Sequence, residues 1–204
     1  EGPVLNPDFS SFVGMHPIPA RHGMTIGEVA LFIKQNNLIE SADKLNLEVI
    51  SGLSWNRNYY SDGGRCKPSF EQTSPNIPFL QNALLYVGTC LLEGTNVSEG
   101  RGIYDYTMEH NLEPGGGAFM QFGAPWLDSQ KIIEELEKYN FEGVRFVSQS
   151  FTPNKSKYKG IQCNGILIII KDGYNEVTPF QIGVSIINEI YKAHPHDFQF
   201  KDNF

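Results

Sequence analysis

Residues 86–102 read YVGTCLLEGTNVSEGRG, and this stretch decides the fold that the sequence predicts. It begins apolar, as a buried strand does. It continues as a polar loop that carries Glu93, Glu99 and Arg101 among three glycines. Because α/β proteins often place their chemistry where a strand ends in such a loop, the stretch predicts a strand followed by a functional site. A solvated turn is the alternative.

The composition indicates a globular chain with few classes of partner. The 204 residues are 40% apolar and 19% charged, enough to bury the core of one large domain. The net charge is −7, without a run rich in Lys or Arg, which argues against nucleic acid and anionic membranes as partners. No apolar run approaches the roughly 18 residues of a membrane span, so none is expected.

Helix signals occur at four places. Thr25 and Glu28 form a capping box at the start of one helix, and a short helix is expected over 78–86. Another begins at Asp128 or Ser129. A last one starts at Thr178 and ends near 194–196. In the helix that begins at 128–129, the expected buried positions are Ile132, Ile133 and Leu136. In the last helix they are Phe180, Val184, Ile187 and Tyr191.

Strands are expected over residues 45–50, in the apolar start of 86–102, and over 144–150 and 162–171. Residues 51–78 predict a long irregular connection, and 103–121 a surface excursion. The resulting order predicts a mixed α/β fold in which helices cover a small mixed sheet.

Glu93 and Glu99 are the candidate acid and base. Glycosidic hydrolysis commonly uses two carboxyl groups, about 5–5.5 Å apart for retention or about 6.5–9.5 Å apart for inversion. The intervening loop must fold back to bring these two together. In the alternative interpretation, one glutamate acts on the substrate and the other pairs with Arg101.

Arg21-His22-Gly23 precedes the first predicted helix, where anions are favoured. The tripeptide also resembles the motif of histidine phosphatases, but the proline-rich residues before it cannot form the strand that those enzymes have there. No histidine or cysteine group has a zinc spacing, so neither a metal nor a cofactor is expected.

Several blocks of the sequence resemble the exo-β-N-acetylmuramidases of the NamZ type, long classed as a domain of unknown function. The blocks include Arg21-His22-Gly23-Met24-Thr25, Glu93-Gly94-Thr95-Asn96, Ser98-Glu99-Gly100-Arg101-Gly102, Gly123-Ala124-Pro125-Trp126 and His194-Pro195-His196. The resemblance implies a glycoside hydrolase that removes terminal N-acetylmuramic acid from peptidoglycan fragments. It also implies a secreted or periplasmic protein, although no signal sequence is visible.

The resemblance implies a single α/β domain over residues 1–204, similar to the C-terminal part of the family only. The Rossmann-like N-terminal part, whose Pro-Glu-His-Gly motif carries the leading catalytic glutamate, is expected to be missing. The chain then supplies one wall of the cleft. Two segments depart from the family pattern: the insertion 103–121, and residues 55–74, which lack Thr-Gly-Leu-Pro-Trp.

The resemblance also suggests roles for the candidate residues. Glu93, Glu99 and His22 are expected to be catalytic, and an arginine is expected to hold the lactyl carboxylate of muramic acid. The expected substrate-binding residues are Arg21, Asn96, Arg101 and Trp126. A muropeptide-binding module without catalysis is the second hypothesis, and a phosphatase the third.

Overall fold

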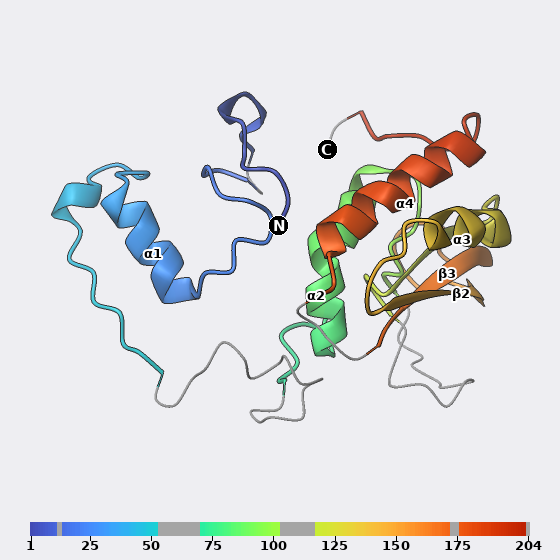
Figure 1. The fold of residues 1–204 in the computed structure, drawn as a ribbon, viewed down its shortest axis with the longest axis horizontal. Coiled ribbons are helices and arrows are strands. Elements are labelled where there is room, and N and C mark those ends of the chain that lie inside the picture. Colours follow the sequence, from blue (N-terminus) through green and yellow to red (C-terminus); the bar gives the residue numbers. More distant parts are fainter. Residues whose placement is uncertain (12–13, 53–69, 103–116, 172–175, 203–204) are drawn as a thin grey trace. The chain divides into compact units, whose positions relative to one another are not determined.

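The computed structural model describes residues 1–11, 14–52, 70–102, 117–171 and 176–202 (Figure 1). Contacts divide the chain into two compact units, Glu1–Arg57 and Asn58–Phe204, which are described separately. The expected helix at 25 and the strands at 144–150 and 162–171 are present. The aromatic and glycine-rich part of the predicted connection, 53–69, and most of the predicted excursion, 103–116, lie outside the described residues.

Among its described residues, the N-terminal unit contains one α-helix, α1, over Ile26–Gln35, and two short 3₁₀ turns over Pro7–Phe9 and Ala42–Lys44. The predicted capping box is confirmed. Thr25 N–H donates to Glu28 Oε2 at 2.7 Å, and Glu28 N–H donates to Thr25 Oγ1 at 3.2 Å. The strand predicted over 45–50 is wrong. This segment pairs with no other strand among the described residues, and Ile50 is 90% exposed. The alternating apolar residues of the segment are therefore not packed against a sheet.

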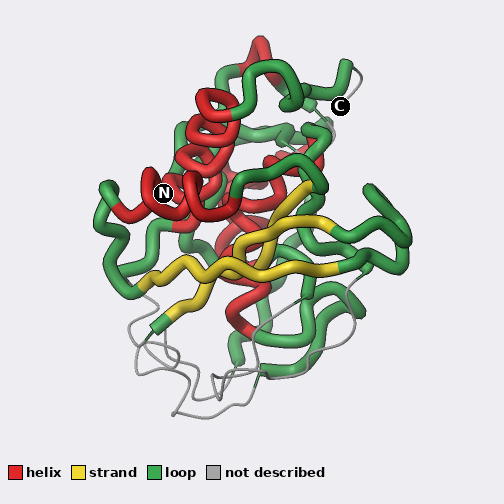
Figure 2. The backbone as a smooth tube through the Cα atoms, turned by 90° about the vertical axis from the view of Figure 1, so that its right-hand side faces the viewer, coloured by secondary structure: helices red, strands yellow, loops and turns green. Residues whose placement is uncertain are grey.

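The larger unit is built on a three-stranded sheet (Figure 2). Its strands are β1 (Gln121–Ala124), β2 (Val144–Phe151) and β3 (Cys163–Ile170), in the order β1-β3-β2. The sheet is antiparallel throughout rather than mixed. β1 was not foreseen, because its four residues follow a polar segment and all four are buried, so that no alternation marks them as a strand.

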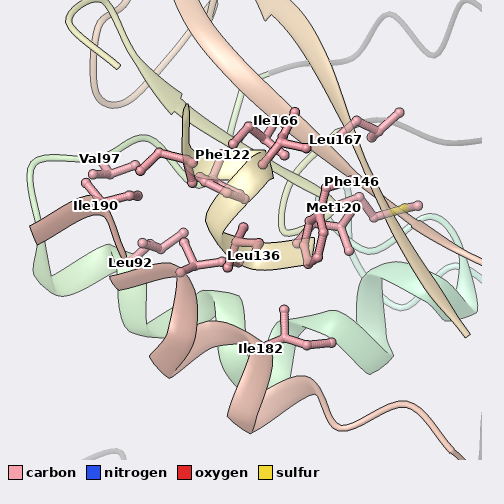
Figure 3. Packing of buried hydrophobic residues seen from close by; sticks show 14 of the residues in the cluster. Leu92, Val97, Met120, Phe122, Leu136, Phe146, Ile166, Leu167, Ile182 and Ile190 are labelled. Carbon is pink, nitrogen blue, oxygen red and sulfur yellow. The ribbon is translucent and has the colours of Figure 1, made fainter. Parts of the chain in front are cut away.

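In the described part of this unit, three α-helices complete the fold: α2 (Leu80–Thr89), α3 (Ser129–Glu137) and α4 (Pro179–Ala193). α3 packs on β2 and β3, and α4 packs on both α2 and α3. Figure 3 shows how side chains from these elements meet in one apolar cluster, among them Leu92, Phe122, Leu136, Ile166 and Ile182. The buried positions predicted for α3 are confirmed, as is its cap, since Asp128 Oδ1 accepts from Lys131 N–H at 3.1 Å.

The strand predicted at the start of 86–102 is wrong. The short helix expected over 78–86 instead continues as α2 to Thr89 and passes into a 3₁₀ segment, Cys90–Gly94. Leu85, Gly88 and Leu92 are buried while Tyr86 is exposed, which is a helical pattern of burial. Gly88 lies directly against the backbone of α4, so the apolar stretch packs on a helix and not in the sheet.

The face of α4 that packs on the core also differs from the prediction. Val184 is 47% and Tyr191 55% exposed, whereas Ile182, Ile186 and Ile190 are fully buried. This helix carries apolar residues on both faces, so periodicity does not select one of them. The contact of Gly183 with Gly88 selects the buried face of α4, because this face lets the backbones of α4 and α2 approach closely.

Glu189 joins α4 to the end of α3. Its Oε1 accepts from Tyr139 Oη at 2.6 Å, from Asn188 Nδ2 at 2.7 Å and from Lys192 Nζ at 2.9 Å. Burial alone would raise the pKa of Glu189, but these hydrogen bonds and the lysine charge together hold that pKa below its usual value. The carboxylate therefore stabilises the fold in its ionised form.

We expect this contribution to stability to disappear in acid. Because the pKa is depressed in the folded state, the stabilisation is present above the unfolded-state pKa and is lost as pH falls through the folded-state value. Glu189→Gln should therefore lower the urea midpoint at pH 7 and have a much smaller effect near pH 3. The exposed Glu137→Gln is the matched control, and an equal effect of Glu189→Gln at both pH values would contradict the assignment.

Candidate active site

Two carboxylates gather on one guanidinium in the larger unit. Glu93 lies in the 3₁₀ segment after α2, and Glu99 lies in the loop that leads toward β1. Arg101 Nη2 pairs with Glu93 Oε1, and Arg101 Nε lies 3.5 Å from Glu99 Oε1. The loop therefore folds back so that both carboxylates face Arg101. The two-carboxylate hypothesis, and the alternative in which one glutamate acts on the substrate and the other pairs with Arg101, stay predictions.

A second cation, Lys157, anchors Glu99 from the opposite side. Its Nζ donates to Glu99 Oε2 at 2.8 Å and to the carbonyl oxygens of Leu92 and Val97 at 2.7 Å each. The Glu99 side chain is only 3% exposed. Burial lowers the pKa of Lys157, and the hydrogen bond and charge of Glu99 oppose that effect. Since all three ammonium protons are used, Lys157 holds the loop and Glu99 in place.

The segment that carries Lys157 has an unusual backbone. Ser156 and Tyr158 flank the lysine with φ angles of 66° and 55°, in the left-handed region that side chains rarely adopt. Such strain is maintained only where the surroundings hold it, and it is common at functional sites. Gly102 lies against this segment, and a Cβ there would come 2.6 Å from Lys155 N. The segment is thus fastened directly beside Arg101.

Phe119 lies beneath the guanidinium of Arg101. Its ring centroid is 5.4 Å from Arg101 Cζ, a cation–π arrangement, and Tyr86 meets the same ring edge-on at 4.7 Å. Phe119 has a φ of 71°, and its N–H donates to Glu99 O at 2.8 Å. Phe119 therefore orients Arg101 from below at the cost of backbone strain.

The predicted residue Trp126 lies at the loop before α3 and is half-buried. Its Nε1 donates to Tyr158 Oη at 3.1 Å, and its ring lies 5.3 Å from the ring of His194. Lys157 and Tyr158 are consecutive, so one segment contacts both Glu99 and Trp126. The structure thus connects Trp126 to the carboxylate cluster through Tyr158.

Asn96 is placed differently from what the sequence suggested. Its Nδ2 donates to Asp197 O at 2.7 Å, and its Oδ1 accepts from Gln199 N–H at 3.0 Å. Both polar atoms of the amide thereby hold the C-terminal segment against the loop. A substrate contact by Asn96 stays a prediction, and the substrate would have to share Nδ2 and Oδ1 with Asp197 and Gln199.

Arg21 and His22 belong to the N-terminal unit. Arg21 Nη1 lies 3.6 Å from Glu1 Oε2, and the exposed His22 accepts from Met24 N–H at 3.0 Å through Nδ1. Glu93 and Glu99 belong to the other compact unit. The proposed roles of Arg21 and His22 stay predictions.

Nucleophilic chemistry by the nearby Cys90 is disfavoured. Burial, with a further contribution from Glu93, raises the pKa of the Cys90 thiol to about 11, so it is protonated at neutral pH.

Across the residues placed in the structure, no group of three or more His, Cys, Asp or Glu side chains is arranged for a metal ion. Every helix in the described ranges is too short or too polar to cross a bilayer.

Lys157, Phe119 and Tyr158 were not anticipated from the sequence. Lys157 lies 58 residues from Glu99, and no local pattern connects them. The only sequence signal was indirect. A buried glutamate needs a cation, and Arg101 was the one cation predicted near Glu93 and Glu99. A second cation from elsewhere in the chain could therefore have been expected.

The larger unit is a small α/β fold that carries two glutamates paired with one arginine. The comparisons name the family. The family model "Exo-beta-N-acetylmuramidase NamZ, C-terminal" matches residues 84–204, and the corresponding N-terminal model matches residues 1–81. The chain belongs to the NamZ exo-β-N-acetylmuramidase family, which confirms the predicted resemblance and extends it beyond the C-terminal part.

Relatives and solved structures agree with this membership. The chain is 36% identical over 200 residues to the peptidoglycan β-N-acetylmuramidase NamZ of Bacillus subtilis (strain 168), covering 98% of this chain and 44% of that protein. A DUF1343 family protein from Bacteroides fragilis aligns with a TM-score of 0.78 and 26% identity, over 96% of this chain and 47% of that one. A second one, at 23% identity, aligns with a TM-score of 0.64 over 99% and 49% of the two chains and supports the fold alone.

The chain thus spans less than half the length of the curated relative. The single domain and the missing Rossmann-like part that the resemblance implied stay predictions.

Proposed function

We propose that this chain forms part of a glycoside hydrolase that removes terminal N-acetylmuramic acid from peptidoglycan fragments. The observation that carries the proposal is the 36% identity to a peptidoglycan β-N-acetylmuramidase over nearly the whole of this chain. The cluster of Glu93, Arg101 and Glu99 supports it, because carboxyl groups perform the proton transfers of glycosidic hydrolysis. The proposed location is secreted or periplasmic, and nucleic acid is not among the proposed partners.

Within this proposal the two glutamates have different roles. Glu99 is buried between Lys157 and Arg101, so it positions those two cations. Glu93 is more accessible and contacts only the outer part of the Arg101 fork, so it is the carboxylate placed to act at the sugar. Arg101, with 38% of its side chain exposed, is suited to hold the lactyl carboxylate of muramic acid.

The remaining predicted residues keep proposed roles toward the same substrate. Arg21 is proposed to share the binding of the lactyl carboxylate, and His22 to transfer a proton or bind a sugar hydroxyl. Asn96 and Trp126 are proposed to contact the sugar. The principal acid is proposed to come from a Rossmann-like part of the protein, in keeping with the family resemblance.

Glu93→Gln should reduce the release of N-acetylmuramic acid by about 100-fold or more, because an amide neither gives nor takes the proton. The substrate is a chromogenic N-acetylmuramic acid glycoside, cleaved by the protein that carries this chain. The exposed Glu137→Gln is the matched control and should keep the wild-type rate. Wild-type turnover by Glu93→Gln would contradict the catalytic role.

The second hypothesis is a muropeptide-binding module without catalysis. Retained binding of muropeptides by the wild-type protein without any release of sugar would support it. Release of phosphate that is lost in His22→Ala would instead support the phosphatase hypothesis.

A further inference from the structure

A polar depression lies on the larger unit, at the start of α3 and beside β2 and β3. Its volume is about 450 Å³, within the range of about 300–1,000 Å³ typical of small-molecule sites. The residues that line it are Trp126, Leu127, Asp128, Ser129, Gln130, Ser148, Ser150 and Asn164. Glu93, Glu99 and Arg101 are not among them, so the depression is separate from the carboxylate cluster.

The depression exists because β2 changes composition along one face. Alternate residues of a strand share a face, so Phe146, Ser148 and Ser150 lie on the same side of the sheet. Phe146 is buried in the apolar cluster, whereas the two serines are exposed. Ser150 is paired with Asn164 of β3. Small hydroxyl side chains thus replace bulky apolar ones, and they leave space between the sheet and Trp126.

Trp126 is held rigidly at the edge of this space. Tyr158 accepts from its indole N–H, and the ring of His194 packs beside it. His194 is itself fixed, because its Nε2 accepts from Asp128 N–H at 3.1 Å. A half-buried indole fixed in this way bounds the depression without a further loss of side-chain entropy on binding.

The polar groups of the lining favour an uncharged partner that bears hydroxyl and amide groups. Among its described lining residues none is basic, and the Asp128 carboxylate disfavours an anion. Ser129 is only 8% exposed, and its Oγ has no hydrogen-bond partner within the described part of the chain. Buried hydroxyls are normally paired, so this one is available to a ligand or water that enters.

We propose that this depression binds one uncharged acetamido-sugar ring of the glycan, next to the anionic muramic acid that Arg101 is proposed to hold. The inference rests on the proposed function. The hydroxyl groups of the sugar pair with Ser148, Ser150 and Asp128, and Trp126 bounds the ring at one edge. Tyr158 and Lys157 connect the two sugar positions, since these consecutive residues contact Trp126 and Glu99.

The test uses the β-1,4-linked disaccharide of N-acetylglucosamine as a neutral probe, with binding followed by saturation-transfer NMR on the purified chain. The wild type should bind at millimolar concentration. Ser150→Tyr, which fills the depression, should weaken binding at least tenfold, and Ser148→Tyr should do the same. Arg145→Tyr adds the same ring to the opposite face of β2 and should leave binding unchanged. Circular dichroism establishes that all three variants fold.

The inference is overturned if the folded wild type does not bind the probe, or if Ser150→Tyr and Ser148→Tyr bind it as the wild type does. Turnover of the chromogenic muramic acid glycoside separates the two proposals. If probe binding depends on Ser150 but no muramic acid is released, the proposed function is contradicted and the sugar-site inference still holds. Release of muramic acid with probe binding indifferent to Ser150 contradicts the sugar site alone.

Discussion

Gly88→Ala should lower the free energy of unfolding by more than about 3 kcal/mol, among the largest effects of a single added methyl group. A Cβ at position 88 would overlap the carbonyl oxygen of Pro179 and lie 2.6 Å from its carbonyl carbon. Both neighbours belong to the backbone of α4, which cannot rotate away as a side chain can. The added carbon would therefore push α2 from α4 and open the apolar cluster that both helices cover.

Urea denaturation at pH 7 measures this effect. Gly183→Ala should behave similarly, because its Cβ would lie 2.7 Å from Gly88 Cα. Gly14→Ala is the matched control, since its Cβ would meet only Leu5 Cδ1 at 3.8 Å, an ordinary contact. A loss below about 1 kcal/mol in Gly88→Ala would show that the two helices do not pack backbone to backbone.

Lys157→Met should cost about 3–5 kcal/mol of stability, because it leaves Glu99 buried with its main cation removed. Methionine keeps the length and apolar stem of the side chain, so packing changes little. The carbonyl oxygens of Leu92 and Val97 also lose a donor. The substitution should in addition loosen the segment that holds Tyr158 against Trp126, and so weaken sugar binding.

A double-mutant cycle isolates the charge pair from these other losses. Glu99→Gln in the Lys157→Met background should recover part of the lost stability, because a neutral amide is less costly to bury than an unpaired carboxylate. The neighbouring Lys159→Met, at an exposed position, should change stability by less than about 0.5 kcal/mol. Strictly additive effects of the two substitutions would mean that Glu99 and Lys157 do not interact.

Much of the larger unit could be predicted from local signals. The Asp128 cap and the stripe Ile132, Ile133 and Leu136 identify α3 within a few residues, and the apolar run before Lys171 identifies β3. The proximity of the three charged groups also follows from the sequence, because Glu93, Glu99 and Arg101 lie within nine residues of chain, while their roles stay predictions. Any fold-back of so short a loop brings them close together.

Two errors share a physical cause. Residues 86–92 and the last helix are apolar on more than one side, so that neither the type of element nor its buried face follows from periodicity. Contacts between distant segments make that choice, as where Gly88 meets Gly183. Residues 45–50 are an error of another kind, because their alternating pattern is clear but they have no neighbouring strand to pair with among the described residues.

The sequence by itself determined the family, through blocks spread along the chain. It also determined the caps at Thr25 and Asp128 and the polar loop of residues 86–102, since these depend on residues close together in the chain, whereas Thr178 makes no side-chain cap bond. Only the tertiary structure decided that this stretch begins as a helix, that Lys157 joins Glu99, and that Phe119 lies beneath Arg101. Each of these needs a partner between about 18 and 95 residues away, and a partner at that distance is selected by packing and by the cost of burying a charge.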